Sequence, residues 1–150
     1  FLRTPVSISV KTRDTATGVE QDIIRVQRGQ EKIDALHDLL VQPDFGKVLI
    51  FGRTKHGVEK LVLVLRKRGI KAESIHGNKS QSQRQRSLDL FKSGRVQVLA
   101  ATDVAARGLD IVGVSHVINY DLPATYDDYV HRIGRTGRGS AAGKALTFIS

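Results

Sequence analysis

Apolar residues follow two alternating patterns from about residue 30 to the end of the chain. Continuous apolar runs, such as Val48-Leu49-Ile50-Phe51, are typical of strands that are buried on both faces of a sheet. Between these runs, apolar residues recur every three or four positions, which is typical of helices with one buried face. The runs predict strands at 48–51, 71–75, 96–100, 114–119 and 145–149, and the periodic segments predict helices at 31–41, 58–65, 81–91 and 126–133.

This alternation of strands with helices of about three turns predicts an α/β fold. Such a succession forms a doubly wound, mainly parallel sheet that is flanked by helices and joined by right-handed crossovers. The first 28 residues differ, because two short alternating strands, at 6–10 and 23–27, enclose a polar and turn-rich segment. We therefore expect an N-terminal arm followed by one domain.

Small, polar and basic residues follow the predicted strands at their carboxyl ends. Phe51 is followed by GRTKHG, Ile75 by HGNKSQ, Ala101 by TDVAARGLD and Asn119 by YDLP. In sheets of this class, ligands bind in the crevice beyond the carboxyl ends of the strands. The pattern therefore places the functional site at this edge.

Charge indicates what the site binds. The chain of 150 residues carries a formal net charge of +9 and has a pI near 10.2, which favours a polyanionic partner, nucleic acid before membrane. A basic surface that only increases solubility is the alternative. No apolar run approaches the roughly 18 residues that would span a bilayer.

Composition also bears on several kinds of site. The chain has no cysteine, so it has neither disulfides nor cysteine-ligated metals, and its five histidines lack metal-binding spacing. A phosphate-binding P-loop is excluded because Gly46-Lys47 and Gly143-Lys144 lack both the upstream glycine and the hydroxyl residue. We therefore expect no metal site and no nucleotide cradle of that kind.

Two segments at the predicted edge carry candidate residues. In HGNKSQSQR, Ser80 is a plausible N-cap, and the helix start behind it, with Gln81 and Arg84, suits a phosphate. A capped surface helix is the alternative. In ATDVAARGLDI, Asp103, Arg107 and Asp110 are polar residues in an otherwise small and apolar stretch, for which a structural salt-bridge network is also an adequate account.

A third segment, HRIGRTGR, contains three arginines. The preceding helix would end at Gly134, so that His131 and Arg132 lie in its last turn, where the helix dipole favours positive charge. That account does not explain Arg135 and Arg138, which lie past the break. Their guanidinium groups could bind phosphate oxygens in a bidentate manner.

Taken in order, these segments resemble the C-terminal RecA-like domain of the DEAD-box RNA helicases of superfamily 2. LIFGRT at 49–54 is similar to motif IV, ATDVAARGLDI at 101–111 to motif V and HRIGRTGR at 131–138 to motif VI. The sequences of the segments RTKHGVEKL and IHGNKSQ are most similar to those of the bacterial RhlE-like group. The resemblance implies a connector at 1–19 and the RecA-like domain at 20–150.

The resemblance also implies roles for individual residues. Two RecA-like domains would close around ATP and RNA, and Arg135 and Arg138 would cross the cleft as catalytic arginine fingers on ATP, with Asp110 bonded to its ribose. The glycines of motif VI would let the chain leave the helix and aim these guanidiniums into the open cleft. RNA-backbone contacts fall on Thr54, Gly77, Arg84, Thr102 and Gly108, and supporting or coupling roles on Gln81, Asp103, Arg107, His131 and Arg132.

The family's ATP-binding motifs do not occur in this sequence: there is no Walker A lysine, no DEAD, no SAT and no Q motif. By resemblance, ATP with Mg²⁺ would be held mainly by the N-terminal RecA-like domain of the same protein, in the cytoplasm. We expect this chain to hydrolyse no ATP alone. RNA contacts would be to sugar and phosphate, independent of base sequence.

Two other readings stay open. The domain could be a non-enzymatic RNA-binding or protein-docking module, or it could belong to a DNA helicase of the same superfamily. VAARGLDI together with HGNKSQ fits the RNA group better. If residues 135 and 138 affect activity when the other domain is present, the chain is part of an enzyme. If they do not, it is a docking module.

Overall fold

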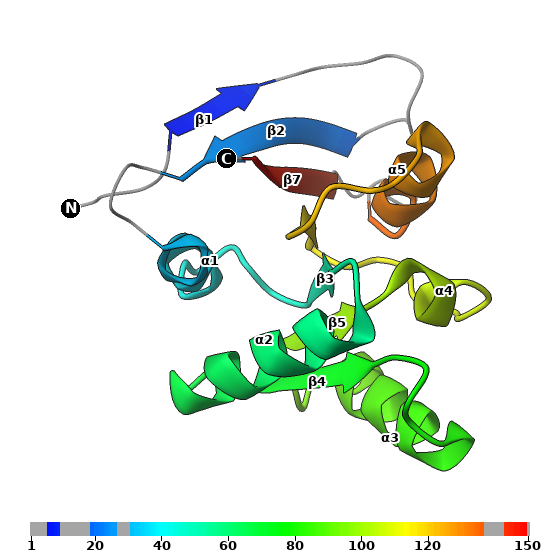
Figure 1. The fold of residues 1–150 in the computed structure, drawn as a ribbon. Helices are drawn as coiled ribbons and strands as arrows, with labels where there is room; N and C mark the ends of the chain where they lie inside the picture. The colour runs from blue at the N-terminus through cyan, green and yellow to red at the C-terminus, as the bar shows by residue number, and fades with distance from the viewer. Residues whose placement is uncertain (1–5, 10–18, 27–30, 137–142, 150) are drawn as a thin grey trace.

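The computed structural model describes residues 6–9, 19–26, 31–136 and 143–149. These residues form one seven-stranded sheet with the strand order β1-β2-β7-β6-β3-β5-β4 (Figure 1). All neighbouring strands from β2 to β4 pair in parallel, and β1 pairs antiparallel with β2. The strands are β1 Val6–Ser9, β2 Val19–Arg25, β3 Val48–Phe51, β4 Ala72–Ile75, β5 Val98–Ala101, β6 His116–Asn119 and β7 Gly143–Ile149.

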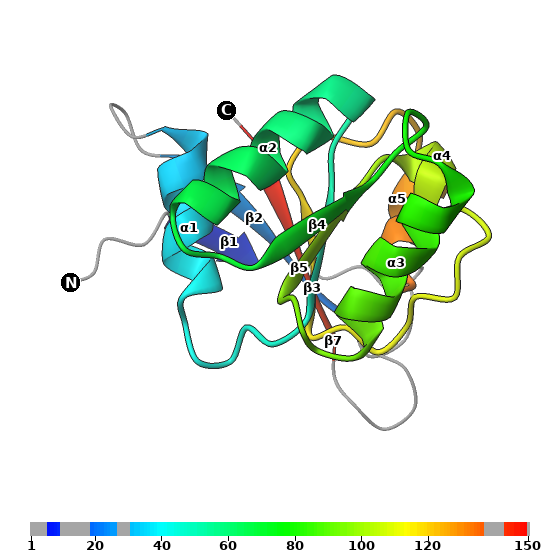
Figure 2. The same cartoon turned by 90° about the horizontal axis from the view of Figure 1, so that it is seen from below.

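Helices cover both faces of the sheet, which confirms the predicted doubly wound α/β fold. Figure 2 shows α1 and α2 on one side of the strands and α3, α4 and α5 on the other. The helices are α1 Lys32–Leu40, α2 Lys55–Lys67, α3 Gln81–Lys92, α4 Asp103–Ala106 and α5 Tyr126–Ile133. Every residue of β3, β5 and β6 is buried, which explains why these strands appear in the sequence as runs without polar alternation.

The two faces have separate cores, and β3 contributes to both. Its alternate residues Val48 and Ile50 pack with α1 and α2, whereas Leu49 and Phe51 pack with α3, α4 and α5. This division follows from the two-residue period of a strand. The central strands are thereby held from both sides, and their ends are fixed relative to one another.

Some element boundaries differ from those predicted. β2 begins at Val19 rather than residue 23, because its parallel pairing with β7 extends from Val19 to Arg25. α2 begins at Lys55 rather than residue 58, because the Thr54 side chain caps it by accepting a hydrogen bond from Gly57 N. Part of the predicted arm, β1, forms an edge strand of the sheet.

Four helices begin at the carboxyl edge of the sheet, and each has a hydroxyl N-cap. The caps of α2, α3, α4 and α5 are Thr54, Ser80, Thr102 and Thr125, and each accepts a hydrogen bond from the backbone N–H three residues later. The positive ends of these helix dipoles therefore collect at this edge. At the opposite, amino edge, Gly69 and Gly94 follow the C-cap residues of α2 and α3, and their φ angles of 87° and 81° lie in the left-handed region that favours glycine.

His116 begins β6 at this amino edge. Its ring stacks on Phe45, with the centroids 3.7 Å apart, and burial lowers the pKa of His116 to about 4. The imidazole is therefore neutral at pH 7.

No helix in the described part of the chain is both long enough and apolar enough to cross a membrane.

Candidate functional site

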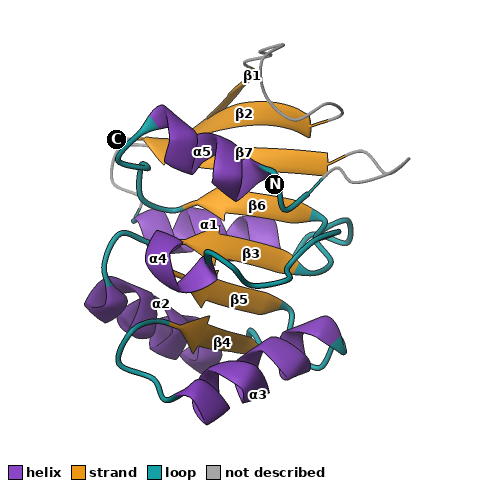
Figure 3. Cartoon of the chain, turned by 90° about the vertical axis from the view of Figure 1, so that its right-hand side faces the viewer, coloured by secondary structure: helices purple, strands orange, loops and turns teal. Residues whose placement is uncertain are grey.

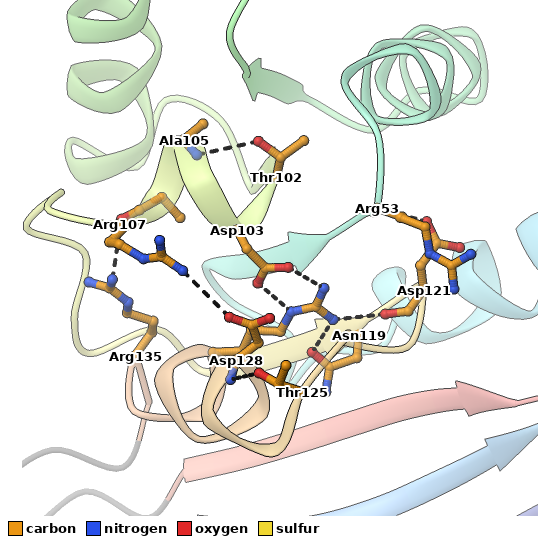
Figure 4. Close-up of polar contacts among 12 residues, drawn as sticks. Arg53, Thr102, Asp103, Ala105, Arg107, Asn119, Asp121, Thr125, Asp128 and Arg135 are labelled. Carbon is orange, nitrogen blue, oxygen red and sulfur yellow. Dashed lines mark hydrogen bonds and ion pairs between the residues drawn. The ribbon is translucent and has the colours of Figure 1, made fainter.

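Arg132 lies at the centre of a polar network at the carboxyl edge. Its side chain stands in the last turn of α5 and is only 1% exposed. The guanidinium binds the Asp103 carboxylate in bidentate fashion, from Nε to Oδ1 and from Nη2 to Oδ2, both at 2.7 Å. Figure 4 draws these two bonds as dashed lines that reach the labelled Asp103. The structure therefore joins motif VI to motif V through two residues that were predicted as couplers.

The remaining nitrogen of Arg132 connects to the end of β6. Nη1 donates to Asn119 Oδ1 at 3.1 Å and to the Asp121 carbonyl at 2.7 Å. The guanidinium also lies 5.0 Å from the ring centroid of Phe51, at the end of β3. One buried arginine thus holds the ends of β3, β5 and β6 and the helix α5 together.

Asn119 and Asp121 have structural roles in this network that the sequence did not predict. Asn119 is fully buried and donates from Nδ2 to Thr147 Oγ1 at 2.9 Å. Asp121 accepts from the backbone N–H of Arg53 at 2.8 Å and from Lys32 Nζ at 3.4 Å. A polar residue that ends an otherwise apolar strand was the available signal, because a buried amide needs a specific partner.

Arg135 contradicts the expected orientation of motif VI. Its half-buried guanidinium donates to three backbone carbonyls of the motif V region, Leu109 at 2.8 Å, Ile111 at 3.4 Å and Ala106 at 3.2 Å. The expectation that it points into an open cleft was wrong for this structure. The physical reason is that three carbonyl oxygens of the same domain lie within its reach. Arg138 lies outside the described residues.

Gly134 also differs from the expectation, although α5 does end where the sequence predicted. Its φ of −66° is an ordinary helical value, so no glycine-specific conformation redirects the chain there. The next residues continue in a tight turn, and the buried Thr136 donates from Oγ1 to the Val114 carbonyl at 2.6 Å. Residues 134–136 are thereby held against the segment that follows α4.

A small cavity of about 140 Å³ lies beside this network, with Arg107, His131 and Arg135 among its lining residues. Arg107 is mostly exposed and reaches Asp128 Oδ1 at 3.5 Å. Asp110, the predicted ribose ligand, does not line the cavity. Its carboxylate is 82% exposed and lies 3.6 Å from Lys92 Nζ.

The predicted RNA-binding residues all lie beyond the carboxyl ends of β3, β4 and β5. The hydroxyls of Thr54 and Thr102 accept capping hydrogen bonds, which leaves their own protons able to bind an anion. Gly77 and Gly108 are exposed, and a β-carbon added to either would meet no atom within 4 Å. Gly108 has a φ of 84°, so glycine is required there for backbone conformation.

Arg84 stands in the first turn of α3. This helix begins with a reciprocal capping box between Ser80 and Gln83, and Gln81 is exposed at its first position. The Arg84 side chain is half-buried, and its Nε is buried with no hydrogen-bond partner among the described residues. A buried unsatisfied donor is rare in native structures and requires an explanation.

The loop before α3 is held by His76, which the sequence reasoning gave no role. His76 is 6% exposed, and its Nδ1 accepts from Asn78 N at 3.3 Å, so that Nε2 donates to Glu59 Oε1 at 3.0 Å. Ser74 Oγ donates to the same Glu59 oxygen at 2.8 Å. The hydrogen bond from His76 lowers the pKa of Glu59. This network fixes the position of the adjacent Gly77.

The arrangement offers cations, hydroxyls and helix N-termini, which are groups that bind phosphate. Within the described ranges, no three His, Asp or Glu side chains are placed to share a metal ion. The cations, hydroxyls and helix N-termini of the edge support the binding of anionic oxygens.

Comparison with protein families and curated proteins gives consistent matches. The model of the helicase conserved C-terminal domain matches residues 31–140. The ATP-dependent RNA helicase CshA of Listeria monocytogenes is 47% identical over 150 residues, which cover 99% of this chain and 29% of that protein. The DEAD-box ATP-dependent RNA helicase CshA of Bacillus subtilis is 46% identical over 151 residues, which cover 100% of this chain and 30% of that protein. The chain thus spans less than a third of the length of these relatives. The narrower resemblance to the RhlE-like group stays a prediction.

Solved structures show the same relationship. The Escherichia coli DEAD-box protein SrmB, bound to regulator of ribonuclease activity A, aligns with a TM-score of 0.81 and 38% identity over 91% of this chain and 79% of that chain. Saccharomyces cerevisiae Dbp5, bound to RNA and ADP BeF3, aligns with a TM-score of 0.79 and 35% identity over 90% of this chain and 36% of that one.

Proposed function

This chain belongs to the family of helicase conserved C-terminal domains, in its DEAD-box group, and we propose from this that it is the second RecA-like domain of an ATP-dependent RNA helicase. In this role it provides half of an RNA-binding surface and the arginine side of an ATP site. We assign the other half of each site to a separate domain, which relatives more than three times as long as this chain have room to contain.

The observation that carries the RNA-binding proposal is the unpartnered Nε of Arg84 at the start of α3. An RNA phosphate beside this helix start would accept from Arg84 and would be favoured by the positive end of the helix dipole. Gly77 and the hydroxyls of Thr54 and Thr102 offer further contacts to the sugar-phosphate backbone of RNA along the same edge. Binding of this kind is indifferent to base sequence and weakens steeply with salt.

For ATP, we assign the finger role to Arg135 and Arg138 and the ribose contact to Asp110. ATP with Mg²⁺, held mainly by the other domain, supplies the phosphoryl group that is hydrolysed. In this structure Arg135 donates to neutral carbonyl oxygens. An ionised phosphate adds charge attraction and can accept two parallel hydrogen bonds from the planar guanidinium, which a neutral carbonyl oxygen cannot. Closure of the two domains would therefore draw Arg135 from the carbonyls to ATP.

The test is steady-state, RNA-stimulated ATP hydrolysis by the two-domain protein that contains this chain. Arg135→Lys keeps the charge but removes the planar fork, and we expect it to lower turnover by at least about a hundredfold. The matched control is Arg68→Lys, the same change at an exposed position in an ion pair with Asp34. Near-normal turnover of the Arg135 variant would reject the finger assignment.

The chain alone should hydrolyse no ATP above background, with or without RNA. ATP turnover by the purified chain that disappears in Arg135→Ala would contradict the proposal that the domain provides only half of the active site.

A further inference from the structure

A basic groove lies at the amino edge of the sheet, on the side opposite to the site described above. The segments that lead into β3, β4 and β5 enclose an open groove of about 520 Å³. Figure 3 shows these three strands side by side, with their amino ends facing away from the starts of α2, α3 and α4. Lys47, Lys71 and Arg95 line the groove, and none of its lining residues is acidic.

Backbone hydrogen bonds fix the spacing of these cations. Val48 N donates to the Gln97 carbonyl at 2.8 Å, and Gln97 N donates to the Lys71 carbonyl at 3.0 Å. Lys47 and Lys71 thus enter the sheet on either side of Gln97, the residue that precedes β5. Since neighbouring strands are about 4.8 Å apart, their backbones are separated by roughly 10 Å. The groove has a cation on each flank and a neutral amide between them.

Two of the three cations have no intramolecular role in the described structure. Lys47 Nζ donates to the Lys92 carbonyl at 2.9 Å and thereby caps the end of α3. Lys71 and Arg95 are exposed, and their side chains form no hydrogen bond or ion pair with any described residue. In contrast, Arg66 and Arg68 on nearby α2 are paired with Glu73 at 3.2 Å and Asp34 at 2.8 Å. Positive charge is therefore left uncompensated at the groove.

A second groove connects this edge with the start of α3. It has a volume of about 560 Å³, follows the outer face of α3, and includes Arg86 and Arg95 among its lining residues. Arg95 therefore belongs to both grooves. α3 extends from the carboxyl edge to the amino edge (Figure 3), and its 12 residues span about 18 Å. Along α3 the second groove has Arg86 and Arg95 as its cations and Asp89 as its one acidic lining residue. Arg84 lies outside both grooves, at the carboxyl-edge end of the same helix, and Arg95 and Lys71 continue the cations into the amino-edge groove.

We propose that the amino-edge groove is a second contact for RNA, which binds the sugar-phosphate backbone of a strand that has left the carboxyl edge along α3. This inference rests on the proposed RNA-binding function and adds a site to it. A polyphosphate chain matches the spaced cations of the two grooves and the absence of an acidic lining residue from the amino-edge groove. Lys71 and Arg95 provide the phosphate contacts, and the lining glycines Gly46, Gly69 and Gly94 leave the groove open.

The experiment compares two RNAs that bind this chain, measured by fluorescence anisotropy over a range of salt concentrations. An RNA of about 6 nucleotides covers the carboxyl edge alone, and one of about 20 nucleotides can also reach the amino edge, since stacked phosphates of one strand are about 3.4 Å apart. The variant is Lys71→Ala with Arg95→Ala. The control is Lys60→Ala with Lys67→Ala, which removes two exposed α2 cations that line neither groove.

We expect the Lys71/Arg95 variant to bind the long RNA roughly five- to tenfold more weakly, with a salt slope reduced by about 1.4, because two phosphate contacts are lost. Its affinity for the short RNA should equal that of the wild type. An unchanged affinity for the long RNA, a loss equal to that of the control, or an equal loss for both RNAs would overturn the proposal. So would binding of poly-glutamate that this variant alone loses while RNA binding is unchanged, since that result assigns the groove to an acidic protein.

Arg84→Ala separates this inference from the proposed function. If Arg84→Ala weakens both RNAs and the Lys71/Arg95 variant weakens neither, the carboxyl-edge site stands and the amino-edge site is wrong. If Arg84→Ala changes neither RNA while the Lys71/Arg95 variant weakens the long one, the proposed carboxyl-edge contact is wrong and the amino edge binds RNA by itself.

Discussion

Arg132 and Arg84 mark two parts of the carboxyl edge that are built in opposite ways. Arg132 is buried, and each of its guanidinium nitrogens donates to a carboxylate, amide or carbonyl oxygen. Arg84 is half-buried, and its Nε has no partner within the described structure. The first part satisfies its own polar groups and holds the domain together. The second leaves a donor unsatisfied, which is the property expected of a ligand site.

The helix dipoles sharpen this contrast. Arg132 lies in the last turn of α5, where the negative end of the dipole favours a cation. Arg84 lies in the first turn of α3, where the positive end of the dipole disfavours it. A bound phosphate would relieve the repulsion at Arg84 but would gain nothing at Arg132. The two parts should therefore respond differently to mutation, Arg132 in folding and Arg84 in binding.

The largest expected effect is that of Arg132→Ala. It leaves the mostly buried Asp103 carboxylate without its bidentate partner, and loss of one member of a buried ion pair destabilises a protein by about 3–5 kcal/mol. The free energy of unfolding should fall by that amount. Because the chain contains no tryptophan, urea unfolding would be followed by circular dichroism.

Two further variants test the cause of that loss. Arg107→Ala removes a 64% exposed arginine that lies 3.5 Å from Asp128, and it should change stability by less than about 1 kcal/mol. The double variant Arg132→Ala with Asp103→Ala should be less destabilised than Arg132→Ala alone, since no charge is then left unpaired. A loss for Arg132→Ala no larger than that for Arg107→Ala would refute the comparison.

The next effect is at Glu59, which supports the loop before α3, beside Arg84, through His76. Glu59→Ala removes the shared acceptor of two buried donors, His76 Nε2 and Ser74 Oγ, and should lower the free energy of unfolding by about 1–3 kcal/mol. Glu59→Gln keeps an acceptor oxygen and should lose less. Equal stability of Glu59→Ala and the wild type in urea unfolding would show that this network does not hold the loop.

The same carboxylate makes stability depend on pH. Its hydrogen bond from His76 lowers the pKa of Glu59 below the ordinary value of 4.5, so the folded state favours the ionised form. The resulting stabilisation is fully present above about pH 4.5 and is lost as the pH falls through the folded-state pKa. Glu59→Gln should therefore flatten the acid limb of a plot of stability against pH. An unchanged acid limb would contradict this assignment.

A smaller effect on stability is expected at Arg135. Its hydrogen bonds to carbonyls of residues 106, 109 and 111 are half-exposed, so Arg135→Ala should destabilise the domain by about 0.5–1.5 kcal/mol. This places Arg135 between the saturated Arg132 and the unsatisfied Arg84. If Arg135→Ala has the same melting temperature as the wild type, the carbonyl contacts contribute nothing to stability in solution.

The sequence predicted the strands and helices well because the two hydrophobic periods differ clearly, and α5 and β3 have the predicted bounds. It also predicted that the candidate residues gather at the carboxyl edge, since that follows from parallel strands. It did not predict the docking of Arg135 or the roles of Asn119 and His76. Those depend on which carbonyls and carboxylates tertiary packing brings within about 3 Å, which no one-dimensional pattern specifies.

The smallest expected effect on stability, and the most informative, is that of Arg84→Ala. Truncation removes a buried donor that has no partner and a cation that the α3 dipole disfavours, so the free energy of unfolding should stay within about 0.5 kcal/mol of the wild type or rise. RNA affinity should nevertheless fall similarly for all base sequences, and the salt slope should flatten by about 0.7, or one phosphate contact on a single strand. Urea unfolding and RNA titration of the same preparation provide both measurements. Arg84→Lys should recover part of the affinity, because a point charge still attracts phosphate without the bidentate geometry. A destabilisation as large as that of Arg132→Ala would place Arg84 among the residues that hold the fold, and the two parts of the edge would then not differ.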